Sequence, residues 1–182
     1  MVSKRLQLFK DLVPGDYKVE FIMPAGYAYA LLDAAAATDA TDSDVSAASN
    51  GMTIVTTLES GENDLGWDAG LVQLASLGNR LWTDTDGDGQ QDAGELGIAG
   101  QTVTLIGGGA DGVIGTGGDD TTTTTTTDAN GEYRFDGLNV GEEYQVEFTT
   151  KPAGTVFTQA NAGGDDTIDS DANTTTGKTQ VV

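Results

Sequence analysis

The sequence lacks two residue types that carry much of protein chemistry, since none of its 182 residues is a cysteine or a histidine. Their absence excludes disulfides, catalysis by Ser-His-Asp or Cys-His groups, zinc and copper centres built on thiolate or imidazole, and histidine-based pH switching. Any bound metal must therefore be held by oxygen atoms, which favours a hard cation such as Ca²⁺.

Basic residues and long hydrophobic runs are also scarce. Eight Lys and Arg residues stand against 29 Asp and Glu residues, so the formal net charge at pH 7 is −21. Such a surface repels phosphate backbones and anionic lipid headgroups, which excludes direct binding to nucleic acid or to a membrane surface. No stretch approaches the roughly 18 apolar residues that span a bilayer, so we expect no membrane insertion.

What the sequence does contain is an internal repeat. Residues 9–26 hold Phe-x-x-Leu, Tyr-x-Val-Glu-Phe and Pro-Ala-Gly in succession, and residues 135–154 hold the same three elements. An Asp-x-x-Asp-Ser-Asp segment likewise occurs at 39–44 and again at 166–171. The offset of about 127 residues is the size of a sandwich domain rather than of a solenoid repeat.

The two copies of this repeat are cut at different points. Residues 1–74 hold the C-terminal part of one repeat, and residues 75–182 hold the following repeat without its last strand. Segment 57–72 closes the first copy and has no counterpart in the second. Two explanations stay open: the chain is a piece of a longer tandem array, or 57–72 of one chain completes 75–182 of the next by strand addition, giving head-to-tail filaments.

The secondary structure predicted from the sequence is all-β. Apolar and polar residues alternate, as in half-buried strands, over 17–21, 102–105 and 144–148. The threonines of 121–127 favour a further strand because they are β-branched. We expect Asn130-Gly131 to form a primed hairpin turn between that strand and the next one.

Residues 84–95 hold the motif with the clearest chemistry, because they match the calcium loop D-x-D-x-D-G-x5-E without a gap. In this pattern three carboxylates give one oxygen each, a glycine reverses the backbone, a carbonyl and an acid follow, and a bidentate glutamate closes the shell. The expected ligands are Asp84, Asp86, Asp88, Gln90, Asp92 and Glu95. Without a cation these acids would repel one another, so a calcium site is favoured over a solvated acidic turn.

The sequences on either side of this loop predict strands, so the loop is spliced between strands rather than helices. A sensor that opens a helix pair is therefore disfavoured, and a structural staple is expected.

Three weaker acidic clusters are further candidates for Ca²⁺, although Asp, Gly and Ser also favour ordinary solvated turns. Their carboxylates are Asp111, Asp119 and Asp120; Asp166, Asp169 and Asp171; and Asp39, Asp42 and Asp44.

Together these motifs resemble the B-type repeats of serine–aspartate repeat surface adhesins, relatives of the collagen-adhesin B-type domain. The resemblance rests on Gly-Asn-x-Leu-Trp at 78–82, on Asp-Gly-Gln-Gln-Asp and Glu-x-Gly-Ile-x-Gly within 88–100, and on Asp-x-x-Gly-x-Tyr-x-Phe at 128–135. It implies an Ig-like, prealbumin-like β-sandwich with Ca²⁺ in its inter-strand loops. It also implies a spacer or stalk in an extracellular or cell-surface protein. Some collagen-adhesin relatives carry a lysine cross-link on the first strand, but that strand, 76–83, has no Lys here, so the bond is not expected.

The function predicted is a structural stalk module whose calcium ions stiffen the loops between strands. Its expected partners are calcium ions and neighbouring repeats, or identical chains end to end. The alternative is an adhesive module for carbohydrate or protein, with an unknown ligand and with Tyr27, Tyr29 and Phe157 as candidate contacts. We interpret Trp67 and Trp82 as packing residues. An enzyme is not expected, because no carboxylate pair lies in an apolar sequence context that would raise a pKa.

Overall fold

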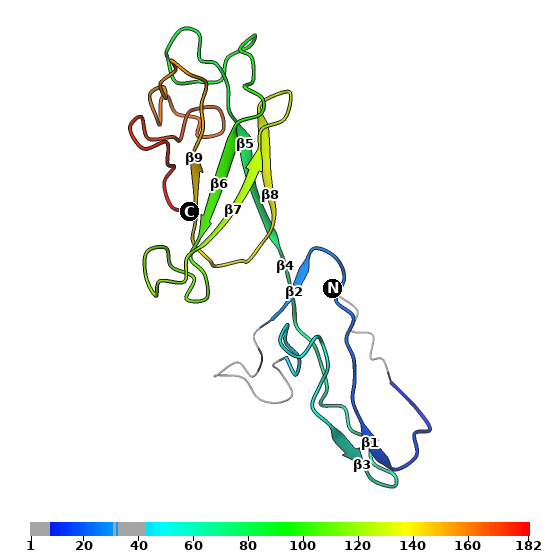
Figure 1. Ribbon diagram of the computed structural model, residues 1–182. Helices are drawn as coiled ribbons and strands as arrows, with labels where there is room; N and C mark the ends of the chain where they lie inside the picture. The colour runs from blue at the N-terminus through cyan, green and yellow to red at the C-terminus, as the bar shows by residue number, and fades with distance from the viewer. Residues whose placement is uncertain (1–7, 31, 33–42) are drawn as a thin grey trace. The chain divides into compact units, whose positions relative to one another are not determined.

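The computed structural model describes residues 8–30, 32 and 43–182 of the chain. The chain divides into two compact units, Met1–Gln73 and Leu74–Val182, which are described separately. The described residues form nine strands and no helix, as Figure 1 shows. The all-β class predicted from the alternating sequence is therefore confirmed.

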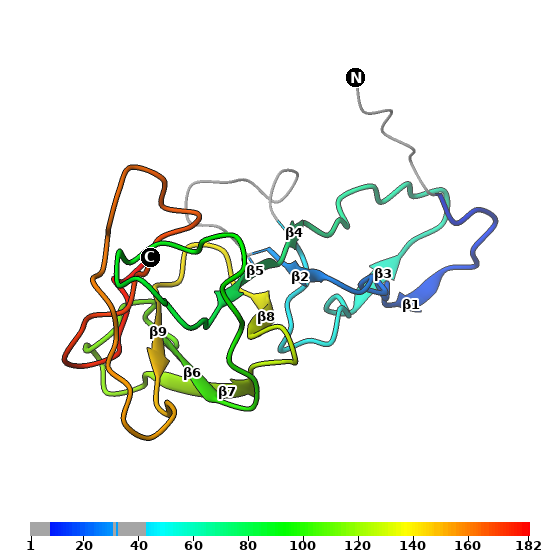
Figure 2. The same cartoon turned by 90° about the horizontal axis from the view of Figure 1, so that it is seen from above.

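The larger unit, Leu74–Val182, is an Ig-like sandwich of two antiparallel layers. One layer pairs β5 (Ala75–Arg80) with β8 (Glu132–Leu138). The other has the order β7-β6-β9, made of β7 (Thr121–Thr126), β6 (Thr102–Gly107) and β9 (Tyr144–Phe148). Figures 1 and 2 show the two layers facing each other. The strands predicted at 102–105, 121–127 and 144–148 all lie in the three-stranded layer.

Side-chain alternation along the strands fills the space between these layers. In β6, Val103 and Leu105 are 0% and 4% exposed, and the residues that alternate with them are half-buried. Tyr133 and Phe135 from β8 and Val146 from β9 complete the buried cluster. This core is small, and much of the larger unit consists of loops around it.

The hairpin predicted at Asn130-Gly131 is wrong. A turn does form there, with the Gly131 amide donating to the Asp128 carbonyl at 3.0 Å, but β8 pairs with β5 whereas β7 pairs with β6. The turn therefore carries the chain from one layer to the other. The physical reason is burial, because Tyr133 in β8 reaches the core when its strand lies opposite β6 rather than beside β7.

The smaller unit, Met1–Gln73, contains two short antiparallel pairs. They join β1 (Gly15–Tyr17) to β3 (Thr56–Leu58), and β2 (Tyr27–Tyr29) to β4 (Leu71–Gln73). The strand predicted over 17–21 is shorter than expected, because β1 ends at Tyr17 and the Val19 amide then donates to the hydroxyl of Thr53 at 3.0 Å. The corresponding strand of the larger unit, β9, is longer because it pairs along its length with β6.

Candidate metal centre

The predicted calcium loop brings three carboxylates together. Asp84, Asp86 and Asp88 each offer an oxygen, and the three oxygens lie within 4.8 Å of one another. A β-bridge between Trp82 and Gly97 closes the two ends of this loop. Carboxylate charges at such distances repel one another, and a divalent cation among them would relieve the repulsion.

Hydrogen bonds orient the first of these carboxylates. Asp84 accepts bonds from the amides of Gly87 and Gly89 at 2.6 and 2.9 Å, and from the hydroxyl of Thr158 at 2.5 Å. Burial acts to raise the pKa of Asp84, but these hydrogen bonds outweigh it and hold the pKa below its ordinary value. Asp84 is therefore a fixed anion at neutral pH.

Glu95 closes the loop from its far end and is only 7% exposed. Its Oε1 accepts from the Thr85 amide at 2.7 Å, and its Oε2 accepts from the Asp92 amide at 3.1 Å. The bond from the Thr85 amide is the main cause that lowers the pKa of Glu95. The pKa of Asp92 is raised, chiefly by the negative charge of Asp88, which shows that the acids of the loop act on one another.

Gln90 connects the loop to a tryptophan. Its backbone carbonyl, the predicted ligand at this position, accepts a hydrogen bond from Nε1 of Trp82 at 3.2 Å. The backbone N–H of Gln90 donates to Oδ1 of Asp88 at 2.8 Å. Trp82 therefore supports the loop by holding its backbone through the hydrogen bond to Gln90.

A second group of carboxylates comprises Asp166, Asp169 and Asp171, whose oxygens also lie within 4.8 Å of one another. Asp169 is only 5% exposed, and its buried Oδ1 has no hydrogen-bond partner. Burial, and then the charges of Asp166 and Asp169, raise the pKa of Asp171. A buried carboxylate oxygen without a donor is unfavourable unless a cation or a proton meets it. The donor set thus fits a divalent cation.

Backbone pairing joins the second group to the loop of residues 84–95. Gln90 and Asp169 form an antiparallel β-bridge, and beside it the Gln91 amide donates to the Ile168 carbonyl at 2.7 Å. The two acidic groups therefore belong to one region of the larger unit, although they lie far apart in the sequence.

Gly89 and Thr158 also take part in contacts between the loop of residues 84–95 and the distant segment that holds the second group. The Ser170 amide donates to the Gly89 carbonyl at 3.0 Å, and a Cβ at Gly89 would lie 2.6 Å from the carbonyl oxygen of Gln159. Thr158, through its bond to Asp84, is a supporting residue that the sequence analysis missed. No local spacing could reveal it, because its contact is set by the packing of a distant segment.

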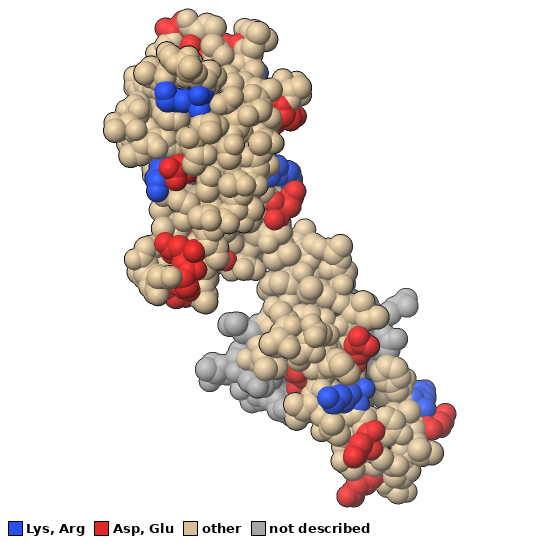
Figure 3. All heavy atoms as spheres, in the orientation of Figure 1, with Lys and Arg blue, Asp and Glu red and all other residues tan. Residues whose placement is uncertain are grey.

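The third candidate cluster lies in the loop between β6 and β7, where Figure 3 shows acidic side chains gathered. Asp119 accepts bonds from two loop amides at 2.7 and 3.2 Å, and Asp120 accepts from the Gly115 amide at 3.0 Å. Asp111 accepts from the Thr116 hydroxyl at 2.6 Å, which lowers its pKa. Within the described part of the chain, these three carboxylates do not form a group like the other two.

The fourth candidate cluster is described only in part, because Asp39 and Asp42 lie outside the described residues. Oδ2 of Asp44 accepts a bond from the Asp68 amide at 2.6 Å, and the Asp44 amide donates to the Asp68 carbonyl at 3.1 Å. In the first copy, then, this acidic segment contacts the stretch that leads into β4.

Comparison with known proteins identifies the family. A family model for the SdrD B-like domain matches residues 6–71 and, separately, residues 75–182. The chain belongs to the SdrD B-like domain family. The resemblance predicted from the motifs is confirmed, and each SdrD B-like match falls within one of the two units of the structure.

Two staphylococcal relatives extend this result. The chain is 40% identical over 171 residues to serine-aspartate repeat-containing protein D of Staphylococcus aureus strain Newman. It is 39% identical over 170 residues to serine-aspartate repeat-containing protein F of Staphylococcus epidermidis strain ATCC 12228 / FDA PCI 1200. Each alignment covers 93% of this chain but only 12% and 9%, respectively, of the relative's length.

Family membership places these SdrD B-like domains outside the cell, at the cell surface, as structural modules of a repeat-containing protein. Over the described residues, no helix has the length and apolar character needed to cross a membrane.

Proposed function

We propose that the SdrD B-like domains of this chain form a calcium-stiffened segment of a cell-surface stalk. The observation that carries the proposal is the buried, unpartnered Oδ1 of Asp169, which lies in a group of three carboxylates. Such an atom is unfavourable as it stands, and a divalent cation would supply its missing partner.

The residues that would hold the ions come from two segments that are already joined. Asp84, Asp86 and Asp88, with Glu95 beside them, would hold one ion in the loop, and the group around Asp169 would hold another. When bound, each ion supplies two positive charges that offset the net charge of −21. Because the Gln90–Asp169 bridge connects the groups, ions at both would stiffen the loop and the distant segment as one body.

Thermal unfolding of the full chain with calcium and with chelator tests the proposal. At a calcium concentration about 100 times the Kd, one site adds about 2.7 kcal/mol to the free energy of unfolding. For a unit of this size that corresponds to a rise of about 10 °C in Tm. Mg²⁺ at the same concentration is the control and should give a smaller rise, because it prefers a smaller octahedral shell.

Native mass spectrometry should count two or more calcium ions per chain under the same conditions. Coincident unfolding curves in calcium and in EDTA, together with a chain mass free of calcium, would contradict the proposal.

The adhesive alternative receives less support from its aromatic candidates. The hydroxyl of Tyr29 donates to the Phe21 carbonyl at 2.5 Å, and the ring of Phe157 lies 6.2 Å from that of Phe148. Two of the three aromatic side chains are therefore engaged inside their own units. Tyr27 alone is exposed, at 37%, and a single aromatic side chain is a small platform for a ligand.

A further inference from the structure

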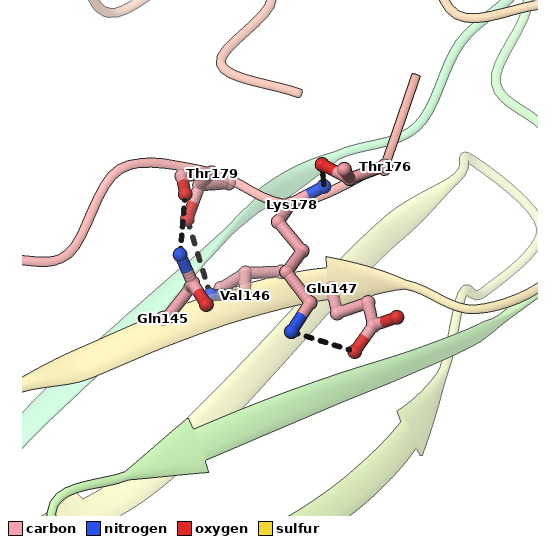
Figure 4. Close-up of polar contacts among 6 residues, drawn as sticks. All are labelled: Gln145, Val146, Glu147, Thr176, Lys178 and Thr179. Carbon is pink, nitrogen blue, oxygen red and sulfur yellow. Dashed lines mark hydrogen bonds and ion pairs between the residues drawn. The ribbon is translucent and has the colours of Figure 1, made fainter. Parts of the chain in front are cut away.

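The three-stranded layer of the larger unit has two edges, and the edge along β9 is covered. The Thr179 amide donates to the Val146 carbonyl at 2.9 Å, and the hydroxyl of Thr179 accepts from the Val146 amide at 3.1 Å. Figure 4 shows these residues, and it shows Lys178 of the same segment reaching toward Glu147 of β9, with 3.7 Å between the ammonium nitrogen and a carboxylate oxygen. The final segment of the chain therefore bonds to the backbone of β9.

The opposite edge of this layer is β7, which pairs with β6 and with no other described strand. The Thr127 amide donates to the Gln101 carbonyl at 3.0 Å, and hydrogen-bonded positions alternate along an antiparallel ladder. The residues of β7 that bond to β6 are therefore Thr121, Thr123 and Thr125. The residues whose N–H and C=O groups point to the free edge are Thr122, Thr124 and Thr126.

This edge is open whether or not the larger unit has a counterpart of 57–72. In the smaller unit, Leu58 of that segment pairs with β1, and Leu71 pairs with β2. The internal repeat matches β1 to β9 and β2 to 155–157. A segment of that kind would therefore lie beside β9 and 155–157, on the side of the layer away from β7.

The sequence of β7 leaves its edge without the features that usually protect one. Edges are blunted by charged side chains, proline or bulges, and Thr121–Thr126 has none of these. All of its residues are β-branched, which favours extended backbone, and all but Thr125 are exposed. Although the formal net charge of the chain is −21, another strand can approach this edge without meeting a charged side chain of β7.

Threonine opposite threonine is a pairing that this layer already contains. On its outer face, Thr124 lies opposite Thr104, and Thr126 lies opposite Thr102. Cross-strand threonine pairs of this kind stabilise antiparallel sheets. A second threonine strand beside β7 would repeat the same contacts one strand further out.

We propose that β7 is a self-association edge, on which β7 of a second copy of this chain adds as an antiparallel strand. Two identical edges pair antiparallel about a two-fold axis, so each copy supplies the same groups to the other. With the axis at Thr123, Thr122 of one copy lies opposite Thr124 of the other. Both of these residues point their backbone groups to the free edge, so they form a hydrogen-bonded pair.

The charges that flank β7 fit this register and favour a second copy as the occupant. The register places each flanking acid opposite an uncharged residue of the second copy: Asp120 opposite Thr126, Asp119 opposite Thr127, and Asp128 opposite Gly118. A basic peptide would find no carboxylate along β7 itself. The contact joins two larger units sheet to sheet, unlike the end-to-end addition of 57–72, and it goes beyond the proposed stalk function because it does not require calcium.

Sedimentation equilibrium of the full chain tests this proposal. A single strand pair is a small interface and the two copies repel each other, so we expect a dimer Kd on the order of 0.1 mM. Raising the salt concentration from about 0.05 M to about 0.5 M should screen the repulsion and lower that Kd.

Substitutions at Thr124 separate edge pairing from other causes of association. Thr124→Pro removes an N–H that faces the free edge and keeps the bonds to β6, which is the setting in which strands accept proline. It should raise the dimer Kd about tenfold or more, because a hydrogen bond is lost at each of two equivalent positions. The matched control, Thr124→Val, keeps the N–H and the shape of the side chain, and it should dimerise as the wild type does.

Amide hydrogen exchange followed by NMR gives a second measurement on the wild type, which decides the matter if Thr124→Pro unfolds the unit. Amides that face the free edge should gain protection as the protein concentration rises, and these are Thr122, Thr124 and Thr126. Amides already bonded to β6 should change little, and these are Thr121, Thr123 and Thr125.

A dimer that Thr124→Pro weakens, or protection that rises at alternate threonines, would support the proposal. A chain that stays monomeric in high salt up to about 1 mM, tenfold above the expected Kd, would overturn it. So would a dimer that Thr124→Pro and Thr124→Val affect equally, or one that leaves exchange at the three edge amides unchanged.

Discussion

Replacing Asp169 by asparagine should have opposite effects with and without calcium. In the calcium-free protein the change removes a buried charge that has Asp166 and Asp171 within 4.8 Å and an Oδ1 without a partner. The new amide can donate to those carboxylates, so the calcium-free variant should be more stable than the wild type. With calcium present, the variant offers the ion a neutral ligand, so calcium should stabilise it less.

The expected size of the effect follows from the burial of Asp169. Leaving a buried acceptor unsatisfied costs about 1–3 kcal/mol, and the amide should recover most of that amount. In a unit of this size each kcal/mol changes Tm by about 4 °C, so Tm in chelator should rise by about 4–12 °C. The rise in Tm that calcium causes should shrink by about half or more, because affinity follows the charge of the ligands.

Thermal melts of the full chain, followed by circular dichroism in EDTA and in calcium, measure both effects. The control is Asp136→Asn, which changes the charge equally but at an exposed ion pair with Arg134. Such surface pairs contribute about 0–1 kcal/mol, so the control should melt close to the wild type under both conditions.

Two results would refute the reasoning. If Asp169→Asn lowers Tm in EDTA, the carboxylate has a stabilising partner in the calcium-free fold. If calcium raises Tm of the variant as much as that of the wild type, Asp169 is not a calcium ligand.

Three further predictions concern backbone strain, titration and the core. Gly89 has a φ of 83° and would clash through a Cβ, so Gly89→Ala should cost more than about 2 kcal/mol of stability. Gly87→Ala, with a φ of 81° and open space around it, should cost only about 1–2 kcal/mol, and equal losses would contradict the contact. Burial raises the pKa of Tyr133 to about 12, so tyrosinate absorbance should show a late step that Tyr133→Phe removes. The buried, neutral Tyr133 contributes about 3 kcal/mol to the free energy of unfolding. This contribution is present below the pKa of about 10 that the tyrosine has in the unfolded chain, and it is lost as the pH rises through the pKa of the folded state. Val103→Ala should lower the free energy of unfolding by about 2–3 kcal/mol, while the exposed Val140→Ala should change it by under about 0.5 kcal/mol, as denaturant titrations would show.

The grouping of the carboxylates at 84–88 could be predicted because its pattern is local. Asp84, Asp86 and Asp88 lie two residues apart, and Gly89 adopts the left-handed backbone that its place in the motif requires. The strands with clear alternation were predictable for the same reason, since period-two burial is a property of neighbouring residues. The Asn130-Gly131 turn was also local, but the pairing partner of the strand after it was not.

The Asp166–Asp171 cluster lies at the limit of what a sequence can show. Its repeat of the 39–44 pattern marked it as a candidate, but the same residues would suit a solvated turn. Only the fold buries Asp169, leaves its Oδ1 unpartnered and sets it across a β-bridge from Gln90. Burial depends on segments that arrive from elsewhere in the chain, so spacing alone could not have separated the two possibilities.

By itself, the sequence determined which chemistry is open to this protein and which local structures form. The absence of histidine and cysteine leaves oxygen as the ligand for any metal, the repeat sets two related units, and alternation sets the strands. The tertiary structure alone decided that β8 crosses to pair with β5, that two acidic segments adjoin, and that β7 lies at an edge of its layer. The physical reason is that backbone preferences act between near neighbours, whereas strand pairing and burial are settled by the free energy of packing the whole unit.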